Sequence, residues 1–353
     1  MPNRFDTRYE IRLAMYSEIS EIMQFIDEYW KKGHILATNR DFFEYEMVVD
    51  GQVNFLIARS LENEKIEGIL GFLPCSKNSE RLDIWGVVWK TIPEAMPMLG
   101  MELKKRLMTI IGARTDLGVG ANPKTSVPLL GRIYHYYTAK MKHYYRLADR
   151  DDYKIAKVER KYIAEYKTDS PVRVREIYSS FELRAFFDFS KVDNVIPYKD
   201  CWYYEKRFFL HPIYKYEVWG IENVHNGNRA VIVTRIQNCN NTTAIRIVDY
   251  LGEQQLFEDC GFFLESLLSN NEYVDFYFEG FEEEYVKKAG MTECVDDGNI
   301  IPDYFNPFEQ TNVDIYVDSS NNEKKCLFFK ADGDQDRPCL LYTSPSPRDQ
   351  RGS

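Results

Sequence analysis

The sequence lacks the short motifs that mark most metal centres. Its 7 cysteines include no CxxC pair, and its 5 histidines form neither an HxH nor an HExxH motif. A structural zinc site needs closely spaced thiol or imidazole ligands, and a disulfide framework needs an even set of cysteines. We therefore expect neither a metal ion nor a set of disulfides.

Signatures of nucleotide-binding enzymes and serine hydrolases are missing as well. The chain contains no GxGxxG, no P-loop and no GxSxG. The first two cradle phosphates in glycine-rich turns, and the third exposes a nucleophilic serine on a sharp turn. Both classes of enzyme are disfavoured.

Positive charge and long apolar runs are scarce. There are 45 Lys and Arg residues against 55 Asp and Glu, which gives a net charge of −10 and argues against nucleic acid or anionic lipid as the main partner. No apolar run approaches the roughly 18–20 residues of a membrane span. The N-terminal sequence MPNRFDTRYE lacks the apolar core of a signal peptide. We expect a cytoplasmic protein of undetermined oligomeric state.

What remains is the composition of a folded protein. Apolar residues make up 44% and charged residues 28% of the chain, near the globular average. Aromatic residues are abundant at 15%, which we interpret as core and half-buried strand rather than a sugar-stacking surface. At about 100–200 residues per domain, a chain of this length favours two domains.

The first half alternates strand and helix signals. Ile19, Ile22, Met23, Ile26 and Trp30 follow the spacing of one helical face. The remaining patterns predict strands at 9–14, 53–59, 65–74, 82–90, 115–121, 140–147 and 153–158, and helices at 41–47, 99–110 and 125–136. This order predicts a mixed sheet with helices on both faces.

The second half repeats this order weakly. The patterns predict helices at 181–187, 200–209, 257–268 and 282–289, and strands at 216–222, 229–237, 243–251, 273–278, 313–318 and 325–330. Gly290 follows the last helix at the position where glycine commonly ends one. We expect domains at 1–168 and 169–338. The final CLLYTSPSPRDQRGS, residues 339–353, resembles a translated sequencing-adapter tail and is left out of the fold.

Residues 82–147 carry a resemblance to a known family. LDIWGVVWKTIPEAMPMLGMELKKRL supplies a strand, a loop and a helix, and LGVGANPKTSVPLLGRIYHYY supplies the next strand and helix. This order resembles the GNAT fold, the Gcn5-related N-acyltransferase fold, present twice. The resemblance implies an α/β (α+β) chain of two GNAT-like domains in tandem, each with a mixed, mostly antiparallel sheet flanked by helices.

The resemblance also implies a site for acyl-coenzyme A as co-substrate. In the family, backbone N–H groups of the loop and helix after the fourth strand hold the pyrophosphate, as helix N-termini do for anions. The family motif Q/R-x-x-G-x-G/A falls on residues 95–100, where only Gly100 agrees. The implied contacts with acetyl-CoA are Met98, Leu99, Gly100 and Met101.

The following helix supplies further candidates. In many relatives an Asn after the fifth strand and the next helix contact the pantetheine arm, and a Tyr protonates the departing thiolate. Asn122, Ser126 and Tyr134 stand at these positions. A tyrosine is a suitable general acid for a sulfur leaving group. Two alternatives stay open: Asn122 as a plain turn residue before Pro123, and Tyr134 as a packing residue.

Two residues are candidates for the base that takes a proton from the acceptor amine. Asp83 lies on the predicted strand 82–90, and His34 lies in the loop between the first helices. Histidine has the pKa for this task. A surface role is the alternative for both. The basic run 104–106 is interpreted as a solvated helix face rather than a phosphate contact.

The second half lacks a glycine-rich loop after Asp249. We therefore expect no coenzyme there, but a scaffold or acceptor-binding role in which His211, Tyr214 and Tyr216 contribute.

Residues 5–338 as a whole are similar to tandem-GNAT acyltransferases found beside bacterial surface-polysaccharide and sugar-nucleotide genes. The resemblance implies transfer of an acyl group to a small-molecule amine, such as an amino sugar or a sugar nucleotide, by direct attack in a ternary complex. One alternative is a Fem-like aminoacyl transferase, for which we expect a basic groove or a coiled-coil arm. The other is a non-catalytic GNAT-fold binding protein.

Overall fold

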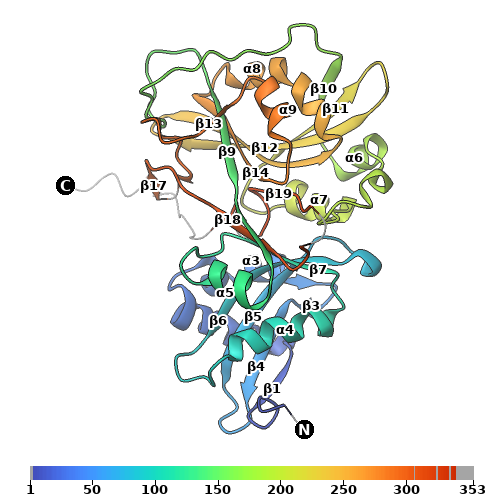
Figure 1. Ribbon diagram of the computed structural model, residues 1–353. Coiled ribbons are helices and arrows are strands. Elements are labelled where there is room, and N and C mark those ends of the chain that lie inside the picture. Colours follow the sequence, from blue (N-terminus) through green and yellow to red (C-terminus); the bar gives the residue numbers. More distant parts are fainter. Residues whose placement is uncertain (1–2, 306, 323–324, 334, 339–353) are drawn as a thin grey trace, which may run out of the picture. The chain divides into compact units, whose positions relative to one another are not determined.

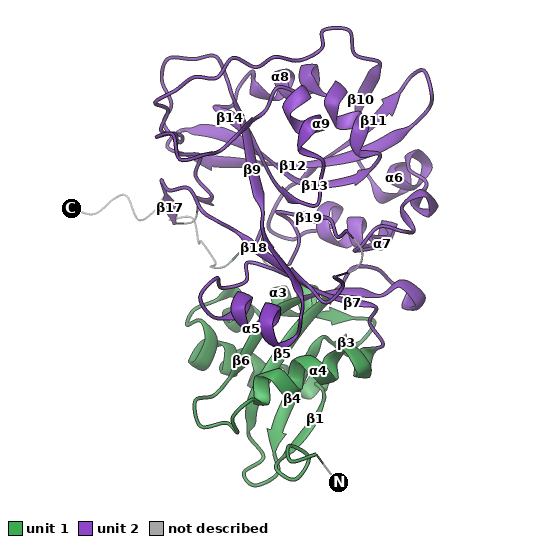
Figure 2. Cartoon of the chain, viewed as in Figure 1, with its two compact units in different colours: residues 1–73, 86–111, 337–353 green, residues 74–85, 112–336 purple. Residues whose placement is uncertain are grey.

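The computed structural model describes residues 3–305, 307–322, 325–333 and 335–338, which fall into two compact units (Figures 1 and 2). Unit 1 comprises residues 1–73, 86–111 and 337–353, and unit 2 comprises residues 74–85 and 112–336. Strand β6 (Asp83–Thr91) therefore begins in unit 2 and ends in unit 1. The expected division at residue 168 concerns a repeat of the fold and stays a prediction. The expected tail, 339–353, lies outside the described residues.

Unit 1 is built on strands in the order β1, β4, β5, β6. β4 (Phe55–Ser60) pairs antiparallel with β1 (Tyr9–Leu13) and with β5 (Ile66–Pro74). The other elements are a 3-10 turn (Tyr16–Glu18), α1 (Ile19–Phe25), a π-helical turn (Ile26–Trp30), α2 (Ile35–Thr38), α3 (Arg40–Met47), β2 (Val48–Val49), β3 (Gln52–Val53) and α4 (Leu99–Ile111).

Helices cover both faces of this sheet. Two glycines of β5 mark the faces, because residues three apart in a strand point to opposite sides. A Cβ on Gly68 would lie 3.0 Å from Leu103 of α4, and a Cβ on Gly71 would lie 2.8 Å from Phe55. Phe55 stacks on Phe43 of α3 with ring centroids 5.6 Å apart. The predicted order of layers is confirmed here.

Unit 2 contains a strand, predicted at 313–318, whose neighbours in the sheet the sequence pattern does not specify. β7 (Thr115–Val119) runs parallel to the start of β6 and antiparallel to β18 (Tyr316–Ser319), and β18 pairs with β8 (Tyr137–Lys140). Helix α5 (Ser126–Ile133) connects β7 to β8. A strand from near the end of the chain therefore lies between two strands of its first half.

The larger sheet of unit 2 has the order β10-β11-β12-β13-β14-β9-β15, with β19 also on β14. Its strands are β9 (Lys142–Leu147), β10 (Val172–Ile177), β11 (Glu217–Asn223), β12 (Arg229–Cys239), β13 (Thr242–Gly252), β14 (Tyr273–Glu279), β15 (Thr292–Glu293) and β19 (Phe328–Phe329). Its other elements are 3-10 turns (Ser79–Arg81, Phe189–Val192 and Gln254–Asp259), a π-helical turn (Glu205–Phe209), α6 (Ser180–Phe186), α7 (Cys201–Tyr204), α8 (Gly261–Leu268), α9 (Glu283–Lys288) and the hairpin β16 (Tyr304–Phe305) and β17 (Phe308–Glu309).

Aromatic side chains form the core of this sheet, as the composition predicted. Phe276 stacks on Phe257 at a centroid distance of 5.4 Å and on Phe329 at 5.8 Å. Phe281 meets Phe276 edge-on at 5.6 Å. All four side chains are buried. Aromatic pairs in these geometries add to the free energy gained from apolar burial.

One predicted strand is wrong. Residues 153–158 form no strand, although Lys157 makes an isolated bridge to Ile300. The buried carboxylate of Glu272 accepts the backbone N–H groups of Lys154 at 2.6 Å, Ile155 at 2.9 Å and Ala156 at 3.2 Å. A side chain thus satisfies the donors that a neighbouring strand would otherwise take. The predicted strand 325–330 is likewise reduced to the two residues of β19.

Candidate functional site

The loop between β6 and α4 ends in a left-handed residue. Met98 has φ of 73°, a conformation that few residues other than glycine adopt. It occupies the position of the first glycine in the motif that the sequence resembles. The backbone therefore keeps a glycine-like conformation although the residue type has changed. The Met98 side chain is 50% exposed.

Helix α4 begins directly after this turn. The Leu99 N–H donates to the Met96 carbonyl at 3.1 Å. The first amides of a helix have no partner within the helix, and the helix dipole adds positive potential at that end. α4 is 13 residues long. The predicted residues Leu99, Gly100 and Met101 thus form a helix N-terminus, a local structure that suits a phosphate group.

A close contact fixes the start of α4 on β6. The Trp89 Nε1–H donates to the Gly100 carbonyl at 2.9 Å. A Cβ on Gly100 would lie 3.0 Å from Trp89 Nε1 and 3.6 Å from Thr91. Glycine at this position is therefore explained by the approach of helix to strand. Lys104 Nζ lies 5.5 Å from the centroid of the Trp89 ring and is buried.

The first turn of α4 also carries an acidic group. Glu102 is buried and accepts hydrogen bonds from Asn3 Nδ2 at 2.5 Å and Arg106 Nε at 2.7 Å. Arg106 also pairs with Asp6 at 2.6 Å. The expected solvated basic face is therefore limited to Lys105, because Lys104 is buried and Arg106 is held by two carboxylates. Arg106 offsets the charge that Glu102 would present to an anion.

Asn122 and Ser126 lie at the start of α5 in unit 2. Asn122 Oδ1 accepts the backbone N–H groups of Lys124 at 2.9 Å and Thr125 at 3.2 Å, and its carbonyl accepts that of Val127 at 3.0 Å. Ser126 is the first helical residue. These bonds give Asn122 the turn-forming role that was open as an alternative.

Tyr134 closes α5 and lies beside a second tyrosine. It is the residue after the last turn of the helix, and its ring centroid is 5.5 Å from that of Tyr136. The Tyr136 hydroxyl donates to Asp116 Oδ2 at 3.1 Å. Burial, together with Asp116 and then Asp318, raises the pKa of Tyr136. Tyr136 therefore stays protonated, and both tyrosines of the pair are half-buried.

Sequence reasoning missed this neighbourhood of Tyr134. Asp116 and Asp318 are both buried, and the Asp318 carboxylate lies over Gly118 on the adjacent strand. An aspartate inside the otherwise apolar strand TDLGV is a signal that could have identified Asp116. Its partner comes from β18, about two hundred residues away, which a local pattern cannot reveal.

His34 does not have the geometry of a base. It precedes α2, and its Nδ1 accepts the Leu36 N–H at 3.2 Å. A neutral imidazole that accepts at Nδ1 carries its proton on Nε2, so neither nitrogen is left to take up a proton. Burial, with a smaller contribution from Lys31, lowers the pKa of His34 to about 4. The structure places it as a helix cap packed on Trp30, with ring centroids 4.8 Å apart.

Asp83 is an anchor for neighbouring segments. It is completely buried, and its two oxygens accept Arg114 Nε at 2.9 Å and Arg114 Nη2 at 2.5 Å. The backbone N–H of Tyr198 donates to it as well, at 2.8 Å. A bidentate pair of this kind fixes the carboxylate. The prediction that Asp83 faces an acceptor is not favoured by this geometry.

The candidate residues of the second half contact other residues of unit 2. His211 Nδ1 accepts the N–H groups of Ile213 at 3.2 Å and Tyr214 at 2.9 Å. Tyr216 donates to Asp336 Oδ2 at 2.9 Å. Asp249 is buried and pairs with Lys199 at 2.6 Å. The His211 contacts are local to one turn, whereas the Tyr216 and Asp249 contacts join separate segments of unit 2.

Three further observations concern cavities, metal ligands and membrane-spanning helices. A cavity of about 1170 Å³ in unit 2 lies at the turn between β12 and β13 and the end of α8, and none of the predicted site residues lines it. Among the described residues, no group of three or more His, Cys, Asp or Glu side chains is arranged to hold a metal ion. No helix in that part of the chain is long and apolar enough to cross a membrane.

Comparisons with known proteins identify the fold. No protein-family model matches the sequence, and no curated protein matches it. Solved structures do match. A GCN5-related N-acetyltransferase from Anabaena variabilis superposes with a TM-score of 0.52 at 10% identity, over 89% of this chain and 73% of that chain. This likeness shows that the chain has the fold of GCN5-related N-acetyltransferases, which confirms the predicted fold class.

Two other structures are similar at lower scores. A GCN5-related N-acetyltransferase from Sphaerobacter thermophilus has a TM-score of 0.41 at 11% identity, over 88% of this chain and 95% of that chain. Saccharomyces cerevisiae N-myristoyltransferase with bound myristoyl-CoA has a TM-score of 0.41 at 9% identity, over 91% of this chain and 82% of that chain. Neither of these two likenesses is used to assign the fold.

Proposed function

We propose that this chain transfers an acyl group from acyl-coenzyme A to the amine of a small-molecule acceptor. The observation that carries the proposal is the turn before α4, where left-handed Met98 leads directly into the helix N-terminus. The chain shares its fold with GCN5-related N-acetyltransferases, and the resemblance implies pyrophosphate binding at this turn. Because such binding uses backbone N–H groups, it depends on backbone conformation more than on residue type.

The reaction joins the acceptor nitrogen to the acyl carbon and breaks the carbon–sulfur bond of the thioester. The nitrogen gives up a proton, and coenzyme A leaves as a thiolate that takes one up. We assign the second proton to Tyr134, which is half-buried at the end of α5. Attack is direct, in a ternary complex, with no acyl-enzyme.

The proton on the acceptor needs a different explanation from the one the sequence suggested. His34 and Asp83 are both engaged by neighbouring backbone or arginine groups. We therefore propose that the acceptor binds as the free amine. Turnover is then expected to rise with pH until the acceptor's own pKa is reached. An amino sugar or a sugar nucleotide is the acceptor that the family resemblance favours.

The experiment is a thiol-release assay on the full chain. Acetyl-CoA is offered with amino sugars, amino-sugar nucleotides, polyamines and amino acids as separate acceptors, and free coenzyme A is followed over time. We expect release that requires an acceptor, with an N-acetylated product detected by mass spectrometry. Absence of acceptor-dependent release from folded protein across the whole panel would contradict the proposal.

A non-catalytic binding role is the second candidate, and one observation favours it. The carboxylate of Glu102 is buried in the first turn of α4, where its negative charge, offset in part by Arg106, opposes a bound pyrophosphate. This candidate predicts no coenzyme binding in the wild-type chain. It also predicts that Glu102→Gln, which keeps the hydrogen-bonding shape, restores some binding.

A further inference from the structure

The parallel strands β13 and β14 separate part-way along their length. Among the described residues their pairing covers Ile245 with Val274, Arg246 with Asp275 and Ile247 with Phe276. β13 nevertheless continues to Gly252 and β14 to Glu279. Val248, where they part, is skipped in the register between β12 and β13, because Val233 pairs with Asp249 and Thr234 with Ile247. Separated strands leave backbone donors and acceptors that need other partners.

A segment from near the end of the chain supplies those partners. On one side Phe328 and Phe329 form β19, which pairs antiparallel with Glu279 and Phe278 of β14. On the other side the Ala331 N–H donates to the Val248 carbonyl at 2.8 Å. We call residues 326–333 the insert. It bonds to the backbone of both strands in the manner of an added strand.

Most of the insert is enclosed, with Leu327 half-buried. Residues from Phe328 to Asp332 are each at most 2% exposed. The carbonyl of Cys326 lies so near Gly280 that a Cβ there would be 2.0 Å from it, and Gly280 has φ of 79°. Any side chain at Gly280 would displace the insert. A glycine is therefore required at the end of β14.

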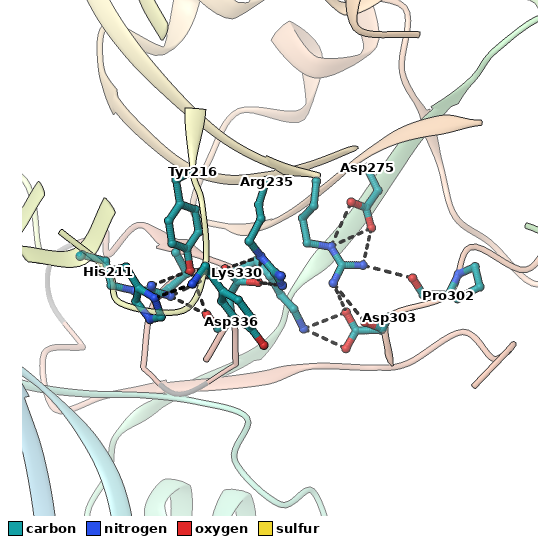
Figure 3. Close-up of polar contacts among 12 residues, drawn as sticks. His211, Tyr216, Arg235, Asp275, Pro302, Asp303, Lys330 and Asp336 are labelled. Atoms are coloured by element: carbon teal, nitrogen blue, oxygen red, sulfur yellow. Dashed lines mark hydrogen bonds and ion pairs between the residues drawn. The ribbon is translucent and has the colours of Figure 1, made fainter. Parts of the chain in front are cut away.

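Ion pairs fix the second half of the insert, and Figure 3 shows the pair of Lys330 with Asp303. Lys330 Nζ lies 2.8 Å from Asp303, which also binds Arg246 at 3.1 Å. Asp332 pairs with Lys199 at 2.7 Å, and its other oxygen accepts the Phe329 N–H at 2.8 Å.

Beyond the insert, Asp336 continues the same anchoring. It binds Arg235 at 2.5 Å and Tyr216 at 2.9 Å, and Arg207 Nη2 donates to its carbonyl at 2.7 Å. All these charged groups except Arg235 are buried. Paired buried charges hold their partners in one arrangement because separating them leaves an uncompensated charge.

We propose that the insert is a built-in ligand of the second half, filling the space between β13 and β14. Because Tyr166 also covers Gly261 at the start of α8, the second half then takes no acyl donor, and the chain binds one donor and not two. The count of donors rests on the proposed function, whereas the filling of the space does not. The second half then serves to hold β18 and the insert, and the donor turn before α4 is the chain's single donor site.

Hydrogen exchange measured by mass spectrometry on the full chain tests both parts. In the free protein, peptides covering 327–332 are expected to exchange at least a hundredfold more slowly than the exposed loop at 224–228. Acetyl-CoA is expected to slow exchange at 96–102 and to leave peptides 247–252 and 277–281 unchanged. Titration calorimetry is expected to give one equivalent of acetyl-CoA per chain.

A pair of variants separates the insert from general stability. Asp332→Asn removes the charge that pairs with Lys199 and is expected to speed exchange at 327–332 at least tenfold, without change at 96–102. Asp169→Asn, at an exposed aspartate, is the matched control with no effect at either place. If Asp332→Asn does not fold, the wild-type exchange pattern decides alone.

The outcomes are distinguishable. Two equivalents of acetyl-CoA, or protection of 247–252 by the coenzyme, overturns the proposal. Fast exchange at 327–332 in the free protein overturns it as well, whatever the coenzyme does. If the coenzyme does not bind at all while 327–332 stays protected, the proposed function fails and the insert remains supported.

Discussion

The turns that follow β6 and β13 begin from the same order of elements, a long strand leading into a helix, and they differ in what surrounds the helix start. After β6, the turn is exposed at Pro97 and Met98 before α4. After β13, a 3-10 turn leads to α8, and a Cβ on its first residue, Gly261, would lie 2.3 Å from the ring of Tyr166. Before α4, Pro97 and Met98 stay exposed, although the Met96 N–H donates to the Tyr9 hydroxyl at 2.9 Å, whereas Tyr166 covers the first residue of α8.

Under the proposed function, this difference explains why the start of α4 can bind a donor and the start of α8 cannot. In the second half, Arg146 donates to the Gly261 carbonyl at 2.9 Å, and the insert bonds to the separated strands. Backbone groups that could recognise a ligand are used by the protein's own residues. Binding can then persist only where such groups are left for it.

The largest expected effect comes from removing a buried ion pair of the insert. Lys330→Met leaves Asp303 with Arg246 as its remaining cation, and removing one partner of a buried pair costs about 3–5 kcal/mol. We expect a loss of that size in the free energy of unfolding measured with urea. Lys325→Met, whose pair with Glu282 is exposed, is the control, with a loss of at most about 1 kcal/mol. Equal losses in the two variants would contradict the claim that the buried ion pair of the insert contributes more stability than an exposed pair.

The next largest effect concerns turnover and the proposed general acid, Tyr134. Tyr134→Phe is expected to lower kcat by about 100-fold or more, the usual contribution of a general acid, with KM for acetyl-CoA unchanged. Tyr136→Phe removes the neighbouring hydroxyl and is expected to leave most of the turnover. Steady-state kinetics of both variants decide the point, and full activity of Tyr134→Phe would take this residue out of the mechanism.

A smaller effect is the pH dependence that Asp332 of the insert gives to the free energy of unfolding. Burial, with the charge of Asp249, raises the pKa of Asp332 to about 6 despite the opposing charge of Lys199. A raised folded-state pKa gives stability that is full below the unfolded value of 3.8 and is lost as pH rises through about 6. His34, with its pKa lowered to about 4, acts in the opposite direction over part of the same range.

The test is therefore the difference in unfolding free energy between wild type and Asp332→Asn. Between pH 4.5 and 7.5 that difference should shift by roughly 2 kcal/mol against the wild type. Urea titrations at several pH values measure it. A difference that does not depend on pH would show that Asp332 titrates as it does in the unfolded chain.

The smallest effect concerns the backbone conformation of Met98 in the turn before α4. Met98→Gly relieves a left-handed φ but adds flexibility to the unfolded chain, whereas Met98→Val puts a β-branched residue in the same strained place. We expect the glycine variant to be more stable than the valine variant by about 1–2 kcal/mol and to bind acetyl-CoA at least as well as wild type. Equal stability of the two variants would mean that Met98 does not keep its left-handed conformation.

The local sequence pattern predicted most helices and strands, but not which strands distant in sequence pair with one another. The predicted strand 82–90 and helix 99–110 match β6 (Asp83–Thr91) and α4 (Leu99–Ile111) closely, because alternation and helical spacing are local properties. The pairing of Ser319 with Leu117 joins residues about two hundred positions apart. Nothing in the period of either segment specifies that neighbour.

The site divides along the same line. Gly100 and the start of α4 follow from a strand, a turn and a helix in sequence, so the motif could locate them. The roles of Asp83 and His34 could not be predicted, because Arg114 and Tyr198, which bind Asp83, are brought to it by folding. The hydrogen bond of His34 depends on where α2 begins. Residue type alone suggested a base in both cases.

The most direct test of the account is a calorimetric titration of acetyl-CoA into the full chain and into Gly100→Leu. The leucine side chain would meet Trp89 and Thr91, which lie 3.0 Å and 3.6 Å from the Cβ position, and so displace the helix start from β6. Lys105→Ala, on the exposed face of α4, is the control. We predict one equivalent bound by wild type and by the control, with affinity for Gly100→Leu reduced at least tenfold. Unchanged binding by Gly100→Leu, or no binding by wild type, would contradict a donor site at the start of α4.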